Sequence, residues 1–144
     1  MLIGEHLHTL DDKNRISLPA KFRSELGKKV VVTRGLDTCL FVYSLKEWKK
    51  FTDSLANLSM GQSSSRAFNR FLLGGAVETD VDTSGRILIP DFLITFAGLS
   101  GKSIVAGVNN RVEIWNEASW RTYTASVERE ADTLAERLGE IGMV

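Results

Sequence analysis

The sequence predicts a mixed α+β fold, mostly β with short helices, built from two copies of one small half. Residues 11–19 (DDKNRISLP) align with residues 82–90 (DTSGRILIP) at an offset of 71. The chain has two prolines, and each lies four residues after the paired arginine of this motif. Further matches follow at an offset of 72: Gly35 with Gly107, Val42 with Ile114, Tyr43 with Trp115 and Trp48 with Trp120. Repetition at a fixed spacing is the signature of a duplicated structural unit, here with the two halves in a pseudo-two-fold arrangement.

Each copy begins with two strands joined by a polar turn. The first strand is expected at 4–9 and at 76–81, and the second at 15–18 and at 86–89, where the apolar run suits a buried strand. Short helices follow at 19–26, closed by Gly27, and at 90–97, closed by Gly98, because glycine accepts the left-handed conformation after a helix. Proline is favoured at the first helical position, so Pro19 and Pro90 are predicted to start these helices.

Each copy continues with two more strands and ends in a helix. The strands are expected at 29–33 and 40–43, and again at 103–106 and 112–115. Ser44 and Glu47 form a capping box that starts a helix at Leu45. Its apolar face is predicted to hold Leu45, Trp48, Phe51, Leu55 and Leu58. A small-residue linker at 60–65 and a short helix at 66–73, broken by Gly74 and Gly75, lead to the second copy.

The last helix is predicted to begin near Glu117 with Asn116 as its cap. Trp120, Val127, Leu134 and Ile141 recur every seven residues along it, facing either the core or a neighbouring subunit. We therefore divide the chain into a first repeat at 5–47, a helical connection at 48–75, a second repeat at 76–119 and a C-terminal helix at 120–144.

Composition indicates a globular, cytoplasmic protein with no membrane partner. Of the 144 residues, 43% are hydrophobic and 25% charged, and no apolar run approaches the roughly 18 residues that span a bilayer. The start of the chain lacks the features of a signal peptide, and a single cysteine, Cys39, excludes an internal disulfide and a cysteine-cluster zinc site. The net charge is zero, but residues 1–50 carry +4 and residues 51–144 carry −4, so a polyanion would approach the N-terminal half.

The paired motif offers candidate DNA contacts. In each turn an aspartate, Asp11 or Asp82, precedes an arginine, Arg15 or Arg86, by four residues. A guanidinium can bind phosphate oxygens or guanine edges, with the aspartate orienting it by a charge-assisted hydrogen bond. From spacing alone, a hairpin ion pair without a ligand is the simpler interpretation.

The two copies differ in charge. Residues 9–23 hold four basic residues against two acidic ones, whereas residues 80–93 hold one against three. Because phosphate neutralisation supplies most non-specific affinity, the first copy is expected to dominate contact with DNA. Lys21 is a candidate contact on the first short helix, and Arg23 is interpreted as an ordinary solvated residue.

At this point the chain resembles the MraZ family, whose halves belong to the swapped-hairpin class shared with AbrB-type regulators. The matching residues extend through both copies: Gly4-Glu5, His8 to Asp11, Lys13, Arg15, Pro19 to Arg23, Thr33 to Asp37, Cys39 to Phe41, Arg66 to Phe68, Arg70-Phe71, Gly74 to Ala76, Asp82, Gly85-Arg86 and Gly107 to Trp115. The family usually has glycine before the arginine in both turns, and this chain has Asn14 in the first and Gly85 in the second. Such a turn calls for a positive φ, which asparagine tolerates better than most residues.

The resemblance implies a sequence-specific DNA-binding transcriptional regulator, associated with the nucleoid and needing no cofactor. It implies repression of its own operon and of the division and cell-wall gene cluster. It also implies a ring-shaped homo-oligomer that contacts short repeated promoter elements in double-stranded DNA. The expected DNA contacts are Lys13, Asn14, Arg15, Lys21 and Arg86, and Asp11, Asp82 and Gly85 are expected to orient the turns.

Other function classes remain as alternatives. An enzyme is one alternative, but the sequence contains no catalytic constellation or phosphate-binding loop that supports it. A self-assembling structural ring and an antitoxin-like DNA-binding module are the other two. His6 and His8 share a strand face but lack a third metal ligand, Cys39 is expected to be a small buried residue, and the Asp82 turn lacks the later ligands of a calcium loop. We therefore expect no metal site.

Overall fold

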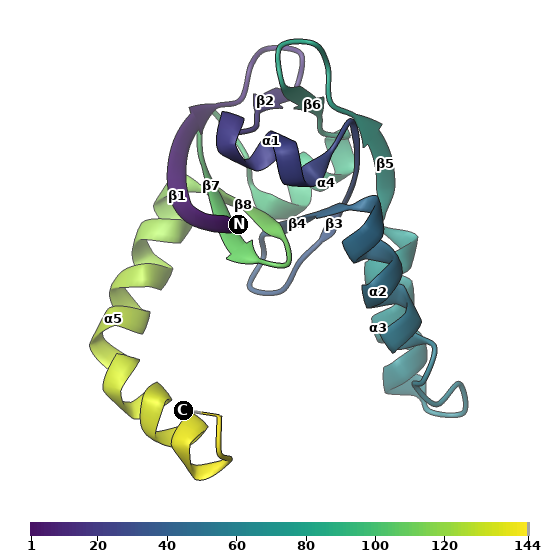
Figure 1. The fold of residues 1–144 in the computed structure, drawn as a ribbon, viewed down its shortest axis with the longest axis vertical. Coiled ribbons are helices and arrows are strands. Elements are labelled where there is room, and N and C mark those ends of the chain that lie inside the picture. The colour runs from purple at the N-terminus through teal and green to yellow at the C-terminus, as the bar shows by residue number, and fades with distance from the viewer. Residues whose placement is uncertain (144) are drawn as a thin grey trace.

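The computed structural model describes residues 1–143 and shows a β head from which helices project (Figure 1). In chain order the elements are β1 (Leu2–Thr9), β2 (Arg15–Ser17), α1 (Ala20–Leu26), β3 (Lys29–Arg34), β4 (Leu40–Ser44), α2 (Leu45–Leu55), α3 (Ser63–Gly74), β5 (Val77–Asp80), β6 (Arg86–Leu88), α4 (Asp91–Ala97), β7 (Lys102–Asn109), β8 (Val112–Asn116) and α5 (Glu117–Glu140). The predicted α+β fold class and its terminal helix are confirmed.

The two halves exchange strands. The main sheet is antiparallel and has the order β1-β7-β8-β4-β3-β5, so the first strand of each half pairs with the third strand of the other. β2 and β6 form a separate two-stranded ribbon in which Ile16 lies opposite Ile87. When each strand is exchanged for its counterpart in the other half, the same strand order results, read from the opposite edge of the sheet. This is the pseudo-two-fold arrangement that the duplication predicts. Each half therefore completes the other.

The sheet has an apolar layer on each face. One layer lies between the sheet, the ribbon and the helices α1 and α4, and its largest buried side chains come from both halves, among them Ile16, Phe22, Ile87 and Leu93. The other layer is aromatic and lies under α2 and α5. It contains Tyr43, Trp48 and Phe51 from one half, and Trp115 and Trp120 from the other. The ribbon is thus held over the first layer, at the end of the molecule farthest from the projecting helices (Figure 1).

Several predicted element boundaries are wrong. Pro19 and Pro90 are N-caps and not first helical residues, since their ψ angles of 139° and 151° are extended. The carbonyl of each accepts the first helical hydrogen bond, from Phe22 and Leu93 respectively. Helix α2 ends at Leu55, so Leu58 does not belong to its apolar face.

The helix α3 begins at Ser63, three residues before the predicted start, with Gln62 as its N-cap. It extends to Gly74, one residue beyond the predicted end. Its last turn is held against β3, where the Thr33 hydroxyl donates to the Leu72 carbonyl over 2.5 Å and Arg34 Nε donates to the Phe71 carbonyl over 3.1 Å.

The pairing of Gly35 with Gly107 is also wrong. In the ladders, Gly107 lies opposite Val112 as Arg34 lies opposite Leu40, so Gly107 is the counterpart of Arg34. The backbone of β1 passes close to Gly107, where an added Cβ would lie 2.5 Å from the nitrogen of Ile3. A side chain at this position would push the first strand away from the sheet.

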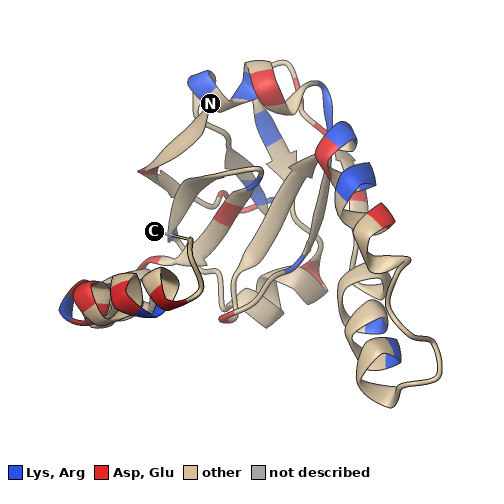
Figure 2. Ribbon diagram, turned by 60° about the horizontal axis from the view of Figure 1, so that its bottom comes forward, with Lys and Arg blue, Asp and Glu red and all other residues tan. Residues whose placement is uncertain are grey.

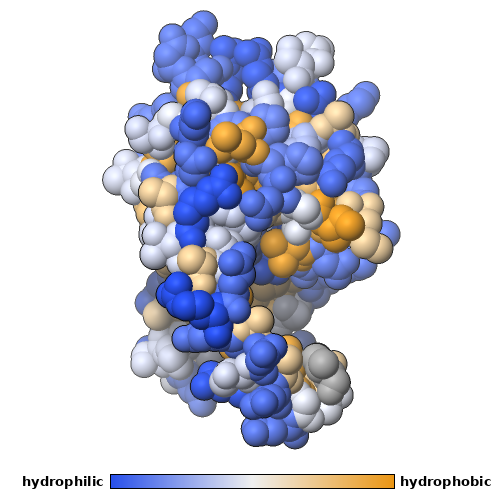
Figure 3. Space-filling model, turned by 90° about the vertical axis from the view of Figure 1, so that its left-hand side faces the viewer, coloured by the Kyte–Doolittle hydropathy of each residue, from blue (hydrophilic) through white to orange (hydrophobic). Residues whose placement is uncertain are grey.

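Two helical projections extend from the head (Figure 1). The helices α2 and α3 form one of them, which we call the arm, and α5 forms the other. The cap predictions for both long helices are confirmed: Ser44 accepts from the Glu47 N–H and Asn116 accepts from the Ser119 N–H. On the side that carries β1 and α5, apolar side chains occur as separate patches among polar ones (Figure 3). Within residues 1–143, none of the helices is both long and apolar enough to cross a bilayer.

Candidate nucleic-acid interface

The two Asp-x-x-x-Arg segments form matching turns, one at each end of the antiparallel ribbon. We call residues 11–15 the first turn and residues 82–86 the second turn. In the first turn, Asp11 Oδ1 accepts the backbone N–H groups of Lys13 and Arg15, at 2.9 and 2.8 Å. In the second turn, Asp82 Oδ1 accepts those of Ser84 and Arg86, both at 2.9 Å. Each aspartate therefore fixes the backbone that carries its arginine.

The other carboxylate oxygen of each aspartate holds the arginine side chain. Arg15 Nε donates to Asp11 Oδ2 over 2.9 Å, and Arg86 Nε donates to Asp82 Oδ2 over 3.0 Å. Both side chains keep about a third of their surface exposed. Within residues 1–143, the Nη groups of Arg15 have no hydrogen-bond partner, so its outer edge is available to a ligand.

The aspartates carry charge at any pH near neutrality. The backbone N–H of Arg15 lowers the pKa of Asp11, and the Arg15 guanidinium and the Lys13 N–H lower it further, against an opposing effect of desolvation. The same groups of the second turn, led by the backbone N–H of Arg86, lower the pKa of Asp82. Each turn therefore contains a carboxylate that accepts several N–H groups and a guanidinium that this carboxylate orients.

The residue before each arginine has the predicted positive φ, 61° at Asn14 and 79° at Gly85. The asparagine also makes a contact that glycine could not, since its Nδ2 donates to Asp91 Oδ1 over 2.7 Å. Asp91 belongs to the other half of the chain. The family's usual glycine is thus replaced without loss of the turn, and an acidic residue is drawn to the first turn.

The outer face of the ribbon presents four side chains. Ile16 and Ile87 are buried, so their neighbours Arg15, Ser17, Arg86 and Leu88 share the opposite face. Arg15 lies opposite Leu88 and Arg86 lies opposite Ser17, which makes the two arginines diagonal neighbours. Arg86 Nη1 reaches to 3.9 Å from Asp11 Oδ2 of the first turn. The ribbon therefore brings together two arginines that are 71 positions apart in the chain.

The remaining predicted contacts are distributed differently. Lys13 is exposed in the first turn. Lys21 Nζ lies 5.6 Å from the centre of the Phe22 ring and faces Gly4 on β1, and none of its contacts is with a turn. Arg23, interpreted from sequence as solvated, is instead packed on Gly85 of the second turn, and its Nε donates to the Leu18 carbonyl over 2.9 Å. One feature of the sequence could have indicated this placement: Arg23 has no charged counterpart, since the matching residue of the second half is Ile94.

The other residues considered from the sequence, Cys39 and His8, lie outside the two turns. Cys39 is fully buried, its Sγ donates to the Leu36 carbonyl, and burial raises the pKa of its thiol. Burial and the charges of His6 and Arg23 lower the pKa of His8. No group of three or more metal-ligating side chains occurs in the described part of the chain.

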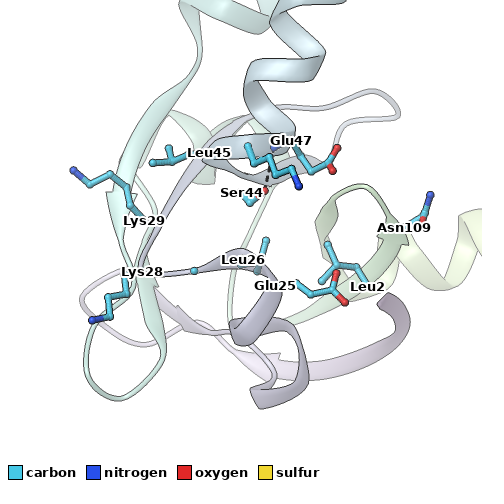
Figure 4. Close-up of a pocket in the computed structure, with 11 residues that line it drawn as sticks. Leu2, Glu25, Leu26, Lys28, Lys29, Ser44, Leu45, Glu47 and Asn109 are labelled. Carbon is cyan, nitrogen blue, oxygen red and sulfur yellow. Dashed lines mark hydrogen bonds between the residues drawn. The ribbon is translucent and has the colours of Figure 1, made fainter.

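A hollow of about 580 Å³ lies between the start of β1, the end of α1 and the start of α2 (Figure 4). Its charged residues have both signs, and Glu25 pairs with the N-terminal ammonium. Lys28 and Lys29 point away from it. This hollow has no convergent set of charged groups, whereas the turns do.

Known proteins resemble this chain over almost its whole length. The family model of the MraZ protein, described as antitoxin-like, matches residues 1–71 and again residues 72–140. A "Transcriptional regulator MraZ" of Caldanaerobacter subterraneus subsp. tengcongensis is 49% identical over 138 residues, which cover 96% of each chain. Proteins of the same name from Caldicellulosiruptor saccharolyticus and Acetivibrio thermocellus are 45% and 42% identical over 143 residues, 99% of this chain and all of theirs.

Proposed function

The chain belongs to the MraZ family, and we propose that it regulates transcription by binding double-stranded DNA through its two turns. The observation that carries the proposal is the pair of arginines on the outer face of the ribbon, each held at Nε by an aspartate of its own turn. A two-stranded ribbon fits the major groove of B-DNA. A guanidinium fixed at Nε presents both Nη groups end-on, which suits the O6 and N7 acceptors of guanine or two phosphate oxygens.

We propose that subunits assemble into a ring that repeats this contact along the DNA. One ribbon offers few phosphate contacts, so a single subunit would bind weakly, and linked copies gain affinity when DNA elements match their spacing. The projecting helices have opposite charge (Figure 2). The arm helices carry five basic residues against two acidic ones, and α5 carries three against six. A basic arm that meets the acidic α5 of the next copy is a head-to-tail contact, which closes into a ring if the rotation allows.

The proposed targets are short repeated elements upstream of the chain's own gene and of the division and cell-wall genes. Repression is the proposed direction, and the place of action is the cytoplasmic nucleoid. Footprinting on the DNA upstream of its own gene tests the site, and a promoter reporter tests the direction. Protected short repeats and higher reporter activity after deletion of the gene are the expected results. An unprotected promoter would contradict the proposal.

Arg15→Ala tests whether the turn makes the contact. We expect this change to weaken binding to the protected element at least tenfold, since loss of one guanidinium contact costs about 1–3 kcal/mol per subunit and the loss is repeated around the ring. Lys102→Ala, which removes one exposed positive charge from β7, outside the arm and α5, is the matched control and should bind like the wild type. Fluorescence anisotropy measures affinity, and light scattering checks that both variants assemble. Equal affinity for the two variants would reject the role of Arg15.

A further inference from the structure

A groove of about 400 Å³ lies beside the second turn, and it is separate from the ribbon face. Its lining comes from both halves of the chain: Arg23, Gly27 and Lys28 from the first, and Val81, Asp82 and Thr83 from the second. Two cations therefore lie at the flank of a turn whose own segment carries mainly acidic residues. The charge count along the chain included Arg23 in the first copy, and the strand exchange places it at the turn of the second copy.

Arg23 is held in place by the second turn itself. Gly85 has a φ of +79°, and a Cβ added there would lie 2.0 Å from Arg23 Cζ, so the guanidinium packs directly against the turn backbone. The single hydrogen bond of its side chain, among the residues that the structure describes, joins Nε to the Leu18 carbonyl. As with Arg15, this leaves the Nη groups available to an external acceptor.

The two cations of the groove are not neutralised within the protein. Both oxygens of Asp82 are occupied by the N–H groups of its own turn and by Arg86 Nε. Within residues 1–143, neither Arg23 nor Lys28 forms an ion pair, whereas the adjacent Lys29 lies 3.8 Å from Asp80. Lys28 is also directed away from the hollow near the chain start (Figure 4). An anion in this groove would therefore meet two uncompensated positive charges.

The pseudo-two-fold axis provides an internal comparison. The residues that correspond to the groove lining at the first turn are Ile94, Gly98, Gly101, Leu10, Asp11 and Asp12. Both cations are absent there, and an aspartate replaces Thr83. In addition, Asp91 is bonded to Asn14 of the first turn. The anion-attracting flank is therefore present on one side of the ribbon and not on the other.

We propose that Arg23 and Lys28 bind a phosphate of the DNA backbone beside the second turn, so that each subunit contacts the backbone asymmetrically. This inference rests on the proposed function. Phosphate contacts position a protein on the duplex without reading its sequence. A one-sided contact would give each pseudo-symmetric ribbon a fixed direction along its DNA element.

The test is the salt dependence of binding by the full-length Arg23→Gln/Lys28→Gln variant. The probe is a duplex of the DNA directly upstream of the chain's own gene. Each lost phosphate contact lowers the slope of log affinity against log salt by about 0.9, so we expect loss of this one contact to lower the slope by about 0.9 per bound subunit. The control, Lys29→Gln/Lys102→Gln, removes two exposed lysines that begin β3 and β7, outside the groove and the arm, and should keep the wild-type slope. Arg23→Lys/Lys28→Arg keeps both charges and should retain most of it.

Ethylation interference on the same duplex locates the contact. For the wild type we expect one phosphate, on one side of each element, whose ethylation blocks binding and which loses this effect in the Gln variant. If that variant fails to fold, Lys28→Gln alone, at an exposed residue, should still lower the slope, by part of the ~0.9 expected for the whole contact. A slope equal to that of the control, while Arg15→Ala weakens binding at least tenfold, would overturn this inference alone. A wild-type protein that ignores the duplex would overturn the proposed function, and this inference with it.

Discussion

At the scale of single residues, each aspartate organises its turn and aims its arginine. Asp11 accepts two backbone N–H groups on one oxygen and Arg15 Nε on the other. A side chain that is already held in one orientation loses less conformational freedom on binding. In the proposed DNA contact, the aspartate would therefore favour binding by orienting the arginine, although its charge repels phosphate.

Asp11→Asn separates these two effects. The amide cannot accept through its nitrogen, so we expect Arg15 to lose its orientation and binding to the specific element to fall about tenfold. The variant has one negative charge fewer, so affinity for unrelated DNA should stay equal or rise. Anisotropy with the specific and a scrambled duplex measures both. If only electrostatics mattered, both affinities would rise together, and that outcome would contradict the orienting role.

The DNA contacts named from the sequence stay predictions, and the structure adds one placement that the sequence did not predict: Arg23, expected to be solvated, packs on the second turn. Lys21 and Arg23 are two positions apart, which on a helix is about 200° of rotation, so they cannot both face the same turn. The helix directs Lys21 towards Phe22 and β1, and Arg23 towards Gly85. The sequence alone gives the rotation between the two residues. It does not give the orientation of the helix, which depends on the tertiary packing of Phe22 and Leu26.

At the scale of elements, the sequence predicted the strands and helices closely where caps or alternation marked them. Ser44 and Asn116 start α2 and α5 as expected. The predictions failed where a pattern has no end signal of its own, as at Leu58, whose helical spacing continues beyond the last turn of α2. They also failed where one residue type serves two positions, as at Pro19, which is compatible with both an N-cap and a first helical residue.

The last helix offers an element-scale prediction. Of its side chains, Trp120 and Tyr123 contact Trp115, and no residue of the helix is fully buried. Deleting residues 128–144 should therefore leave the head folded, with a melting temperature within a few degrees of the wild type, but reduce the particle to smaller species. Light scattering and circular dichroism measure the two effects. A shorter deletion of residues 142–144 is the control, and an intact ring after the longer deletion would show that α5 is not the assembly surface.

At the scale of the whole molecule, strand exchange decides which charges meet. It moves Asp91 to the first turn and Arg23 to the second. An alignment of the two copies establishes the duplication, but it is equally compatible with each half pairing its own strands. The resemblance to a swapped-hairpin class indicated the exchange, and the ladder of β1 with β7 confirms it. The distribution of charge between the turns could be read only after this pairing was known.

The exchange predicts that neither half folds alone. Cutting the chain between α2 and α3 gives residues 1–58 and 59–144, and it leaves β1, β2, β5 and β6 without their partners. The core also favours the mixed pair, because Phe22 and Leu26 of one half correspond to the smaller Leu93 and Ala97 of the other. A homodimer of the first half would hold two of each large side chain, and overpacking costs typically about 1–3 kcal/mol.

We therefore expect the two fragments, when mixed or co-expressed, to form a 1:1 complex with the circular dichroism spectrum of the intact chain. Without the tether, which supplies an effective concentration in the millimolar range, the melting temperature of the complex should rise with protein concentration. Phe22→Ala in the first fragment should weaken the complex by about 3–5 kcal/mol through the cavity it leaves, whereas Ser24→Ala, at an exposed position of the same helix, should not. Two fragments that each fold as stable monomers would show that the halves do not depend on the exchanged strands.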